Sequence, residues 1–163
     1  MLSFLESIKK LEETDEFKEF IEINKDAFLS NGFTIYENEN SKWQIGYYSP
    51  KKNMFFNFLT KDKIYIEESE KISEEEVSKL NVKKIKTDIK EILDNVEKIR
   101  KKKYPLDKIE KIIVILQSIK NKTLWNLTCI TTNFKTIQIK INAINKKLIS
   151  SDIKSIFELK KSG

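Results

Sequence analysis

Histidine is absent from this 163-residue chain, and cysteine occurs once, at Cys129. Without histidine there can be no Ser-His or Cys-His catalytic pair, because the imidazole is the base in both. A single cysteine excludes an intrachain disulfide and a thiolate zinc site within one chain. Three glycines are too few for a glycine-rich phosphate loop. We therefore predict a protein that is not an enzyme and has no cofactor or metal site; a pair of carboxylates assembled by folding stays open as an alternative.

Long apolar segments are absent too. No 18 uncharged apolar residues run together, and the N-terminal sequence MLSFLESIKKLEETDEF has no basic segment followed by an apolar stretch of secretory length. These absences predict a cytoplasmic protein without membrane contact. The composition, 39% hydrophobic and 34% charged, is that of a folded chain. Within it, the apolar segment LWNLTCI predicts that Cys129 is a buried, unreactive thiol.

The charged residues are unevenly distributed along the chain. The formal net charge is +6, with 11 Lys and 17 Asp/Glu (net −6) in residues 1–80 and 20 Lys/Arg and 8 Asp/Glu (net +12) in residues 81–163. This asymmetry favours attraction between the two halves, with head-to-tail association or an anionic partner as alternatives.

One basic segment of the second half is a candidate nucleic-acid site. Its residues are Lys98, Arg100, Lys101, Lys102 and Lys103. Clustered cations bind phosphates in a salt-dependent way, so nucleic-acid binding is our alternative function. A basic last turn also complements the helix dipole, and only one aromatic residue, Tyr104, is adjacent for base stacking.

The first half predicts helices followed by strands. Apolar spacing predicts a short helix over residues 2–11 and a longer one from Thr14 or Asp15 through Phe28, with a stop at residues 30–32. The segments FTIYE, KWQIGYY, NMFFNFLT and KIYIE then predict an antiparallel meander. These elements form a first module over residues 1–68.

The second half repeats the pattern. A charged connector spans residues 69–86, where Ser73 and Glu76 form a capping-box signature for a short helix. The second module, residues 87–163, begins with a helix that Thr87 or Asp88 can cap and that Pro105 ends, and strands follow. Placing Trp43 on Trp125 aligns WQIGYY with WNLTCI. Continued without a gap, the alignment sets Phe55, Asn57 and Leu59 on Ile137, Ile139 and Ile141.

A helix followed by a curled antiparallel meander, with an aromatic residue opening one strand and the hairpin TIQIKINAINKKLISS, resembles the PepSY domain, which often occurs in tandem. The resemblance is clearest over residues 87–152. Asn142, Ala143, Asn145 and Lys146 stand where that family commonly has Asp, a small residue and Gly. It implies a non-catalytic module that binds or restrains a partner protein. We thus predict an α+β fold of two α-β-β-β modules packed as one compact unit; a single larger sheet with helices on one side is the alternative.

The segment NMFFNFL has apolar side chains on both faces of its predicted strand. If Phe55 and Leu59 point inward, as the alignment indicates, an apolar patch points outward. The candidate partner-binding residues are Tyr48, Met54, Phe56 and Phe58. They predict a protein-interaction module that binds a second copy or another protein; cover by residues 2–11 or by the other half is the alternative.

Overall fold

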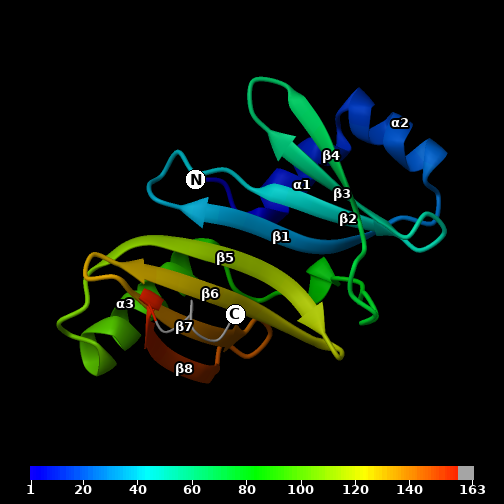
Figure 1. Ribbon diagram of the computed structural model, residues 1–163. Coiled ribbons are helices and arrows are strands. Elements are labelled where there is room, and N and C mark those ends of the chain that lie inside the picture. The colour runs from blue at the N-terminus through cyan, green and yellow to red at the C-terminus, as the bar shows by residue number, and fades with distance from the viewer. Residues whose placement is uncertain (158–163) are drawn as a thin grey trace.

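The structure, a computed structural model, describes residues 1–157 and combines helices with one antiparallel sheet (Figure 1). The helical elements are α1 (Phe4–Glu12), α2 (Asp15–Ile23), the 3-10 turn η1 (Val82–Lys84) and α3 (Ile89–Lys103). The strands are β1 (Phe28–Tyr36), β2 (Gln44–Ser49), β3 (Met54–Thr60), β4 (Ile64–Glu70), β5 (Ile109–Ile119), β6 (Lys122–Thr131), β7 (Lys135–Asn142) and β8 (Leu148–Ser155). The chain is therefore an α+β protein, as predicted.

All eight strands belong to one sheet, in the order β4-β3-β2-β1-β5-β6-β7-β8. Each half of the chain contributes a four-strand meander, and β1 and β5 pair antiparallel in the middle (Figure 1). The count of three strands per α-β-β-β module is one short in each half, although the segment KIYIE had been included as a candidate strand and corresponds to β4. The single sheet with helices on one face agrees with the alternative prediction. The sequences of β4 and β8, IYIEESE and LISSDIKS, are more polar than those of the inner strands, as is common for edge strands, so their strand signal is weak.

The helices α1, α2 and α3 begin at side-chain caps, of which the one at α1 was not predicted. Ser3 and Glu6 form a capping box at α1, and the Thr14 hydroxyl accepts a hydrogen bond from the Phe17 amide at α2. Asp88 caps α3, which ends at Lys103 before Pro105 as predicted. In the connector no helix forms at residues 73–76; the short helical element there is η1.

The helix predicted from Thr14 to Phe28 ends at Ile23 instead. Asn24 is its C-cap, and both its backbone amide and its side-chain amide donate to the Phe20 carbonyl, at 2.8 and 3.0 Å. The supposed stop at residues 30–32 lies inside β1. Gly32 has no left-handed backbone; its role is spatial, because a Cβ there would collide with the ring of Phe4 on α1.

The core lies between the helices and one face of the sheet. Phe17 and Phe20 of α2 pack on Tyr47, Phe56 and Phe58, with ring centroids 5.0 to 6.0 Å apart. Phe4 of α1 meets the ring of Trp43 edge-on at 5.1 Å. In the other half, α3 buries Ile89, Ile92 and Val96 in the same core cluster, together with the buried isoleucines of β7. One face of the sheet is thereby covered along both halves.

A buried carboxylate ties the α3–β5 connection to the β6–β7 turn. The Asp107 carboxylate accepts a hydrogen bond from the side-chain amide of Asn133 at 2.8 Å and pairs with the Lys135 ammonium at 3.1 Å. The hydrogen bond from Asn133, with the charge of Lys135 next, holds the pKa of Asp107 below its ordinary value. The carboxylate is therefore a structural anion at neutral pH.

We expect Asp107→Asn to lower the free energy of unfolding by about 1–3 kcal/mol near neutral pH, because two charge-assisted contacts are weakened. Because the pKa of Asp107 is lower in the folded than in the unfolded protein, the ionised carboxylate stabilises the fold at pH values above the unfolded-state pKa. This stabilisation is lost as the pH falls through the native pKa. The difference in the free energy of unfolding between wild type and Asp107→Asn should thus become smaller below about pH 4. Urea unfolding at several pH values measures it, and a difference that grows on acidification would contradict the assignment.

Candidate functional site

The predicted partner-binding patch does not exist as a surface. In the β2–β3 register Tyr47 pairs with Phe56 and Ile45 with Phe58, so these side chains face the helices. Phe56 is 4% exposed and Phe58 fully buried. The outward orientation predicted for Met54, Phe56 and Phe58 is therefore wrong. These side chains are covered within the chain, as the alternative predicted. The covering element is α2, however, and not residues 2–11 or the other half.

Tyr48 lies on the opposite face from Phe56. It pairs with Phe55 in the register, and its ring lies 5.0 Å from that of Phe55 and 5.7 Å from that of Phe28. Met54 pairs with Ser49 on the helix side and is partly buried against the core. The four candidate residues thus divide between two faces and form no common patch.

A difference of one residue in turn length explains the error. Four residues, 50–53, separate Ser49 from Met54, whereas three residues, 132–134, separate Thr131 from Lys135. The ungapped alignment from Trp43 onto Trp125 therefore slips by one position after the turn. Because side chains alternate, one residue of slip exchanges the faces. Ile45 pairs with Phe58 as Leu127 pairs with Ile139, so Phe58 is the counterpart of Ile139.

The face of the sheet opposite the helices carries its own apolar surface, which we call the open face. In the described residues no helix packs on it. Across its centre Phe33 pairs with Ile115 and Ile35 with Ile113. The outward residues of β1, β2 and β3 include no charged side chain; they are Phe28, Asn31, Phe33, Ile35, Gln44, Gly46, Tyr48, Phe55, Asn57 and Leu59.

Polar side chains replace the apolar ones toward β8. From the Ile115 row the register continues to Asn126 on β6 and Lys140 on β7, and from the Ile113 row to Thr128, Gln138 and Asp152. The open face therefore has an uncharged centre on β3, β2, β1 and the part of β5 at residues 113–117. Its margins are charged or polar: Lys111 at the start of β5, Glu67 on β4, and the polar residues of β6 to β8. This composition resembles the core and rim of a protein interface.

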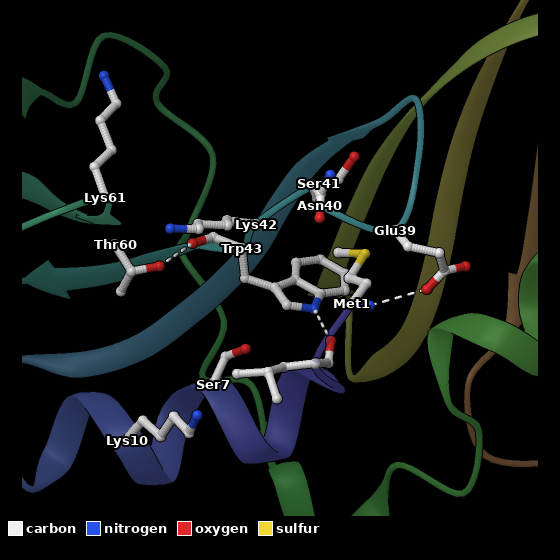
Figure 2. A pocket seen from close by; sticks show the side chains of 11 residues that line it. Met1, Ser7, Lys10, Glu39, Asn40, Ser41, Lys42, Trp43, Thr60 and Lys61 are labelled. Carbon is white, nitrogen blue, oxygen red and sulfur yellow. Dashed lines mark hydrogen bonds and ion pairs between the residues drawn. The ribbon is translucent and has the colours of Figure 1, made fainter.

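A pocket of about 640 Å³ lies between α1 and the β1–β2 connection (Figure 2). The indole of Trp43, 2% exposed, donates from Nε1 to the Leu2 carbonyl at 3.2 Å. Lys10, Lys42 and Lys61 contribute side chains to the lining, and in the described part of the chain none has an ion-pair partner. The lining of this pocket is therefore positively charged, with the hydroxyls of Ser7, Ser41 and Thr60 among the lysines.

Glu39 is the one carboxylate of the pocket, and it is already engaged. It pairs with the Met1 ammonium at 2.9 Å and accepts a hydrogen bond from the Tyr36 hydroxyl at 3.2 Å. The hydrogen bond from the ammonium, followed by that from Tyr36, lowers the pKa of Glu39. The carboxylate is thus a poor proton acceptor at neutral pH.

The tryptophans that the alignment matched lie against each other. The rings of Trp43 and Trp125 are 6.1 Å apart. Each indole N–H donates to the residue before a helix N-cap: Trp43 to the Leu2 carbonyl, and Trp125 to the Thr87 hydroxyl at 2.7 Å. The Thr87 hydroxyl in turn donates to the Ala143 carbonyl at 3.3 Å. The two halves therefore meet at a buried aromatic pair.

The structure divides the basic segment at the end of α3. Arg100 is held by Glu97 at 2.8 Å and by two carbonyls of the α3–β5 connection, and Lys103 donates to Ser151 at 2.9 Å. Lys101 pairs at 3.8 Å with Glu97. Lys98 and Lys102 are exposed and lie one turn apart. Two of the five cations are thus engaged by hydrogen bonds or ion pairs at short distance, and nucleic-acid binding stays a prediction.

The lone thiol is buried, as predicted. Cys129 has no exposed surface, and burial raises its pKa to about 12. Within residues 1–157 no three His, Cys, Asp or Glu side chains are grouped closely enough to hold a metal ion. Over the same residues no helix has the length and apolar character needed to cross a membrane.

Comparisons with known proteins identify no family. No family model matches the chain, and no curated protein matches it. The crystal structure of a candidate lipoprotein from Clostridium difficile 630 matches with a TM-score of 0.54 and 13% identity, covering 86% of this chain and 91% of that one. At this identity the likeness shows the fold alone. The cytoplasmic location that we predicted is contradicted by the match with a lipoprotein candidate and is withdrawn.

Proposed function

We propose that this protein is a non-catalytic protein-interaction module that pairs with a second copy of itself through the open face. The observation that carries the proposal is the lack of charge on the outward side of β1, β2 and β3 in a chain of which 34% is charged. A sheet face that only meets water is normally polar. Depletion of charge with retention of aromatic side chains is typical of interface centres.

The charge distribution favours a second copy as the occupant. In a symmetric dimer the same patch meets itself, so any charge near the symmetry axis meets a like charge. With a net charge of +6, two chains repel each other over most orientations. The uncharged centre of the open face limits the opposing charges to the margins, where Lys71 lies over the Tyr48 ring at 5.9 Å and Lys111 pairs with Glu37. Apolar pairs such as Phe33–Ile115 provide area to bury.

The dimensions of the whole sheet are close to those of a standard protein interface. Eight strands at about 4.8 Å spacing and roughly six residues of about 3.3 Å each give a face of roughly 700 Å². A standard interface buries about 800 Å² per partner. Face-to-face packing of two such sheets therefore approaches the size of a specific dimer.

We also infer that the sheet is built from two PepSY-like modules, residues 1–68 and 87–163, joined by the connector 69–86. The mirrored strand order around β1 and β5 supports this inference. The equivalent tethers of Trp43 and Trp125 next to helix N-termini support it further. In this arrangement α1 and α2 together occupy the place that α3 has in the second module.

Sedimentation velocity tests the self-association. We expect the wild type to sediment with twice its 19.3 kDa mass as concentration rises. The double variant Ile35→Lys, Ile113→Lys places cations at the centre of the open face and should weaken pairing by about a hundredfold or more, because like charges across an interface cost several kcal/mol.

The matched control is Ile23→Lys, which introduces the same charge at a residue of α2 that is 73% exposed. It should associate as the wild type does. Thermal melting checks that both variants are folded. A wild type that stays monomeric, or a folded double variant that still dimerises, would refute the proposal.

A further inference from the structure

Exposed apolar side chains gather at one end of the sheet, which we call the apolar tip. Leu106 is 91% exposed in the α3–β5 connection, and Phe134 is 64% exposed in the β6–β7 turn. The ring of Phe157, 63% exposed, lies 6.5 Å from that of Phe134. Side chains this exposed contribute little to the core, so their grouping points to an external contact.

Hydrogen bonds fix the two loops of the tip beside each other. The Asp107 carboxylate, next to Leu106, accepts from the Asn133 amide at 2.8 Å, next to Phe134. The Thr132 amide donates to the Lys108 carbonyl at 2.9 Å. Because β5 and β6 are antiparallel, as are β6 and β7, the start of β5, the end of β6 and the start of β7 lie at the same end of the sheet (Figure 1).

The segment that leads into the apolar tip is rich in cations. Residues 98–108 hold six of them and a single carboxylate, Asp107, which is already paired. The side chain of Lys101 is 69% exposed. Lys98, Lys102 and Lys108 are exposed and have no ion-pair partner in the part of the chain that the structure describes. Apolar side chains at a loop tip and free lysines behind them form an amphipathic surface.

We propose that the apolar tip docks on the surface of an anionic lipid bilayer. Leu106 and Phe134 enter the boundary between headgroups and acyl chains, and the lysines at the end of α3 lie over anionic headgroups. This departs from our expectation of no membrane contact. It is independent of the open face, which lies on the side of the sheet away from the helices.

The chemistry of the tip favours a bilayer over nucleic acid. An aliphatic side chain as exposed as Leu106 gains nothing from a phosphate backbone, whereas it gains hydrocarbon contact in a bilayer. The free lysines of α3, Lys98 and Lys102, lie one turn apart on one side of the helix, and the adjacent aromatic ring, Tyr104, packs partly against the core and offers little surface for base stacking. Binding to an anionic bilayer and binding to nucleic acid both weaken as salt is added. The test must therefore include vesicles and an oligonucleotide.

Co-sedimentation with vesicles tests the proposal. We expect the protein to bind vesicles of phosphatidylcholine and phosphatidylglycerol and not those of phosphatidylcholine alone. The double variant Leu106→Ser, Phe134→Asn should reduce the partition coefficient about tenfold or more; Asn at 134 tolerates the local φ of 61°. Lys101→Gln, Lys102→Gln should reduce it about fivefold for each charge.

Matched controls separate insertion from general charge and hydrophobicity. Ile72→Ser removes a 96% exposed apolar residue of the connector, and Lys83→Gln, Lys84→Gln removes two exposed charges there; both should bind as the wild type does. In Leu106→Trp, the added indole should shift its emission to shorter wavelength on binding, while Trp43 and Trp125 stay buried.

The proposal is overturned if the anionic vesicles are not bound, or if the folded tip variant binds them as tightly as the wild type. Binding of a single-stranded oligonucleotide without binding of vesicles would assign the cations to nucleic acid instead. Failure of the self-association test leaves these outcomes unchanged, because Ile35 and Ile113 are not part of the tip.

Discussion

Phe58→Ala should lower the free energy of unfolding by about 3–5 kcal/mol, the usual cost of deleting a buried phenylalanine ring. Phe58 is fully buried, and its ring contacts those of Phe17, Phe20 and Tyr47 at 5.0 to 5.8 Å. Its removal leaves a cavity under α2 and loosens the attachment of that helix. Urea unfolding followed by far-ultraviolet circular dichroism measures the loss.

Phe55→Ala is the matched control, since Phe55 lies three residues away on the open face and is only partly buried. It should cost clearly less than Phe58→Ala. A larger loss at Phe55 than at Phe58 would show that the two faces of β3 have been interchanged. The double variant Phe56→Lys, Phe58→Lys should prevent folding, because both side chains are buried under α2. This variant is therefore unsuitable for testing whether these residues bind a partner.

Trp125→Ala should cost about 3–5 kcal/mol as well, for a different reason. Trp125 is 1% exposed, contacts Trp43 across the centre of the molecule and donates to the Thr87 hydroxyl. The substitution therefore removes packing between the halves and a hydrogen bond that fixes the start of α3. Because both halves share one sheet through β1 and β5, we expect a single cooperative transition at lower urea.

Trp125→Phe is the graded control. It keeps an aromatic ring beside Trp43 and deletes the indole donor, so it should cost less than the alanine variant, about 1–3 kcal/mol. Thermal melting with near-ultraviolet circular dichroism follows both variants. Two separate transitions in Trp125→Ala would contradict the view that the halves fold as one cooperative unit.

Local signals predicted much of the fold. Caps at Thr14 and Asp88 and the stop before Pro105 are local, because each depends on a few neighbouring residues, and the structure confirms them. The end of α2 was missed since Asn24 acts as a C-cap, whereas the segment that follows, rich in Ser, Asn and Gly, suggested a later stop. Both edge strands had a local signal, in KIYIE and in the hairpin TIQIKINAINKKLISS, but the three-strand modules left them out because β4 is almost entirely polar beyond Ile66 and β8 is also polar.

The candidate site was harder to predict because it depends on register. The sequence NMFFNFL shows that both faces of β3 are apolar, and this was recognised. Which residues face the helices depends on the length of the preceding turn, and an alignment without gaps cannot detect a change of one residue. The uncharged face across β1, β2 and β3 emerges only when the strands are paired, since its residues alternate with core residues in each segment.

The most direct test of the central claim is the distance between two copies across the open face. A nitroxide on Thr128→Cys lies at the margin of that face, and Cys129 does not compete for the label because it is buried with a pKa of about 12. Double electron–electron resonance should then show a defined intermolecular distance that disappears on dilution with unlabelled protein. A label on Ile23→Cys should give a longer distance or none. Absence of any dipolar coupling from position 128, at concentrations where the labelled protein is folded, would contradict pairing through the open face.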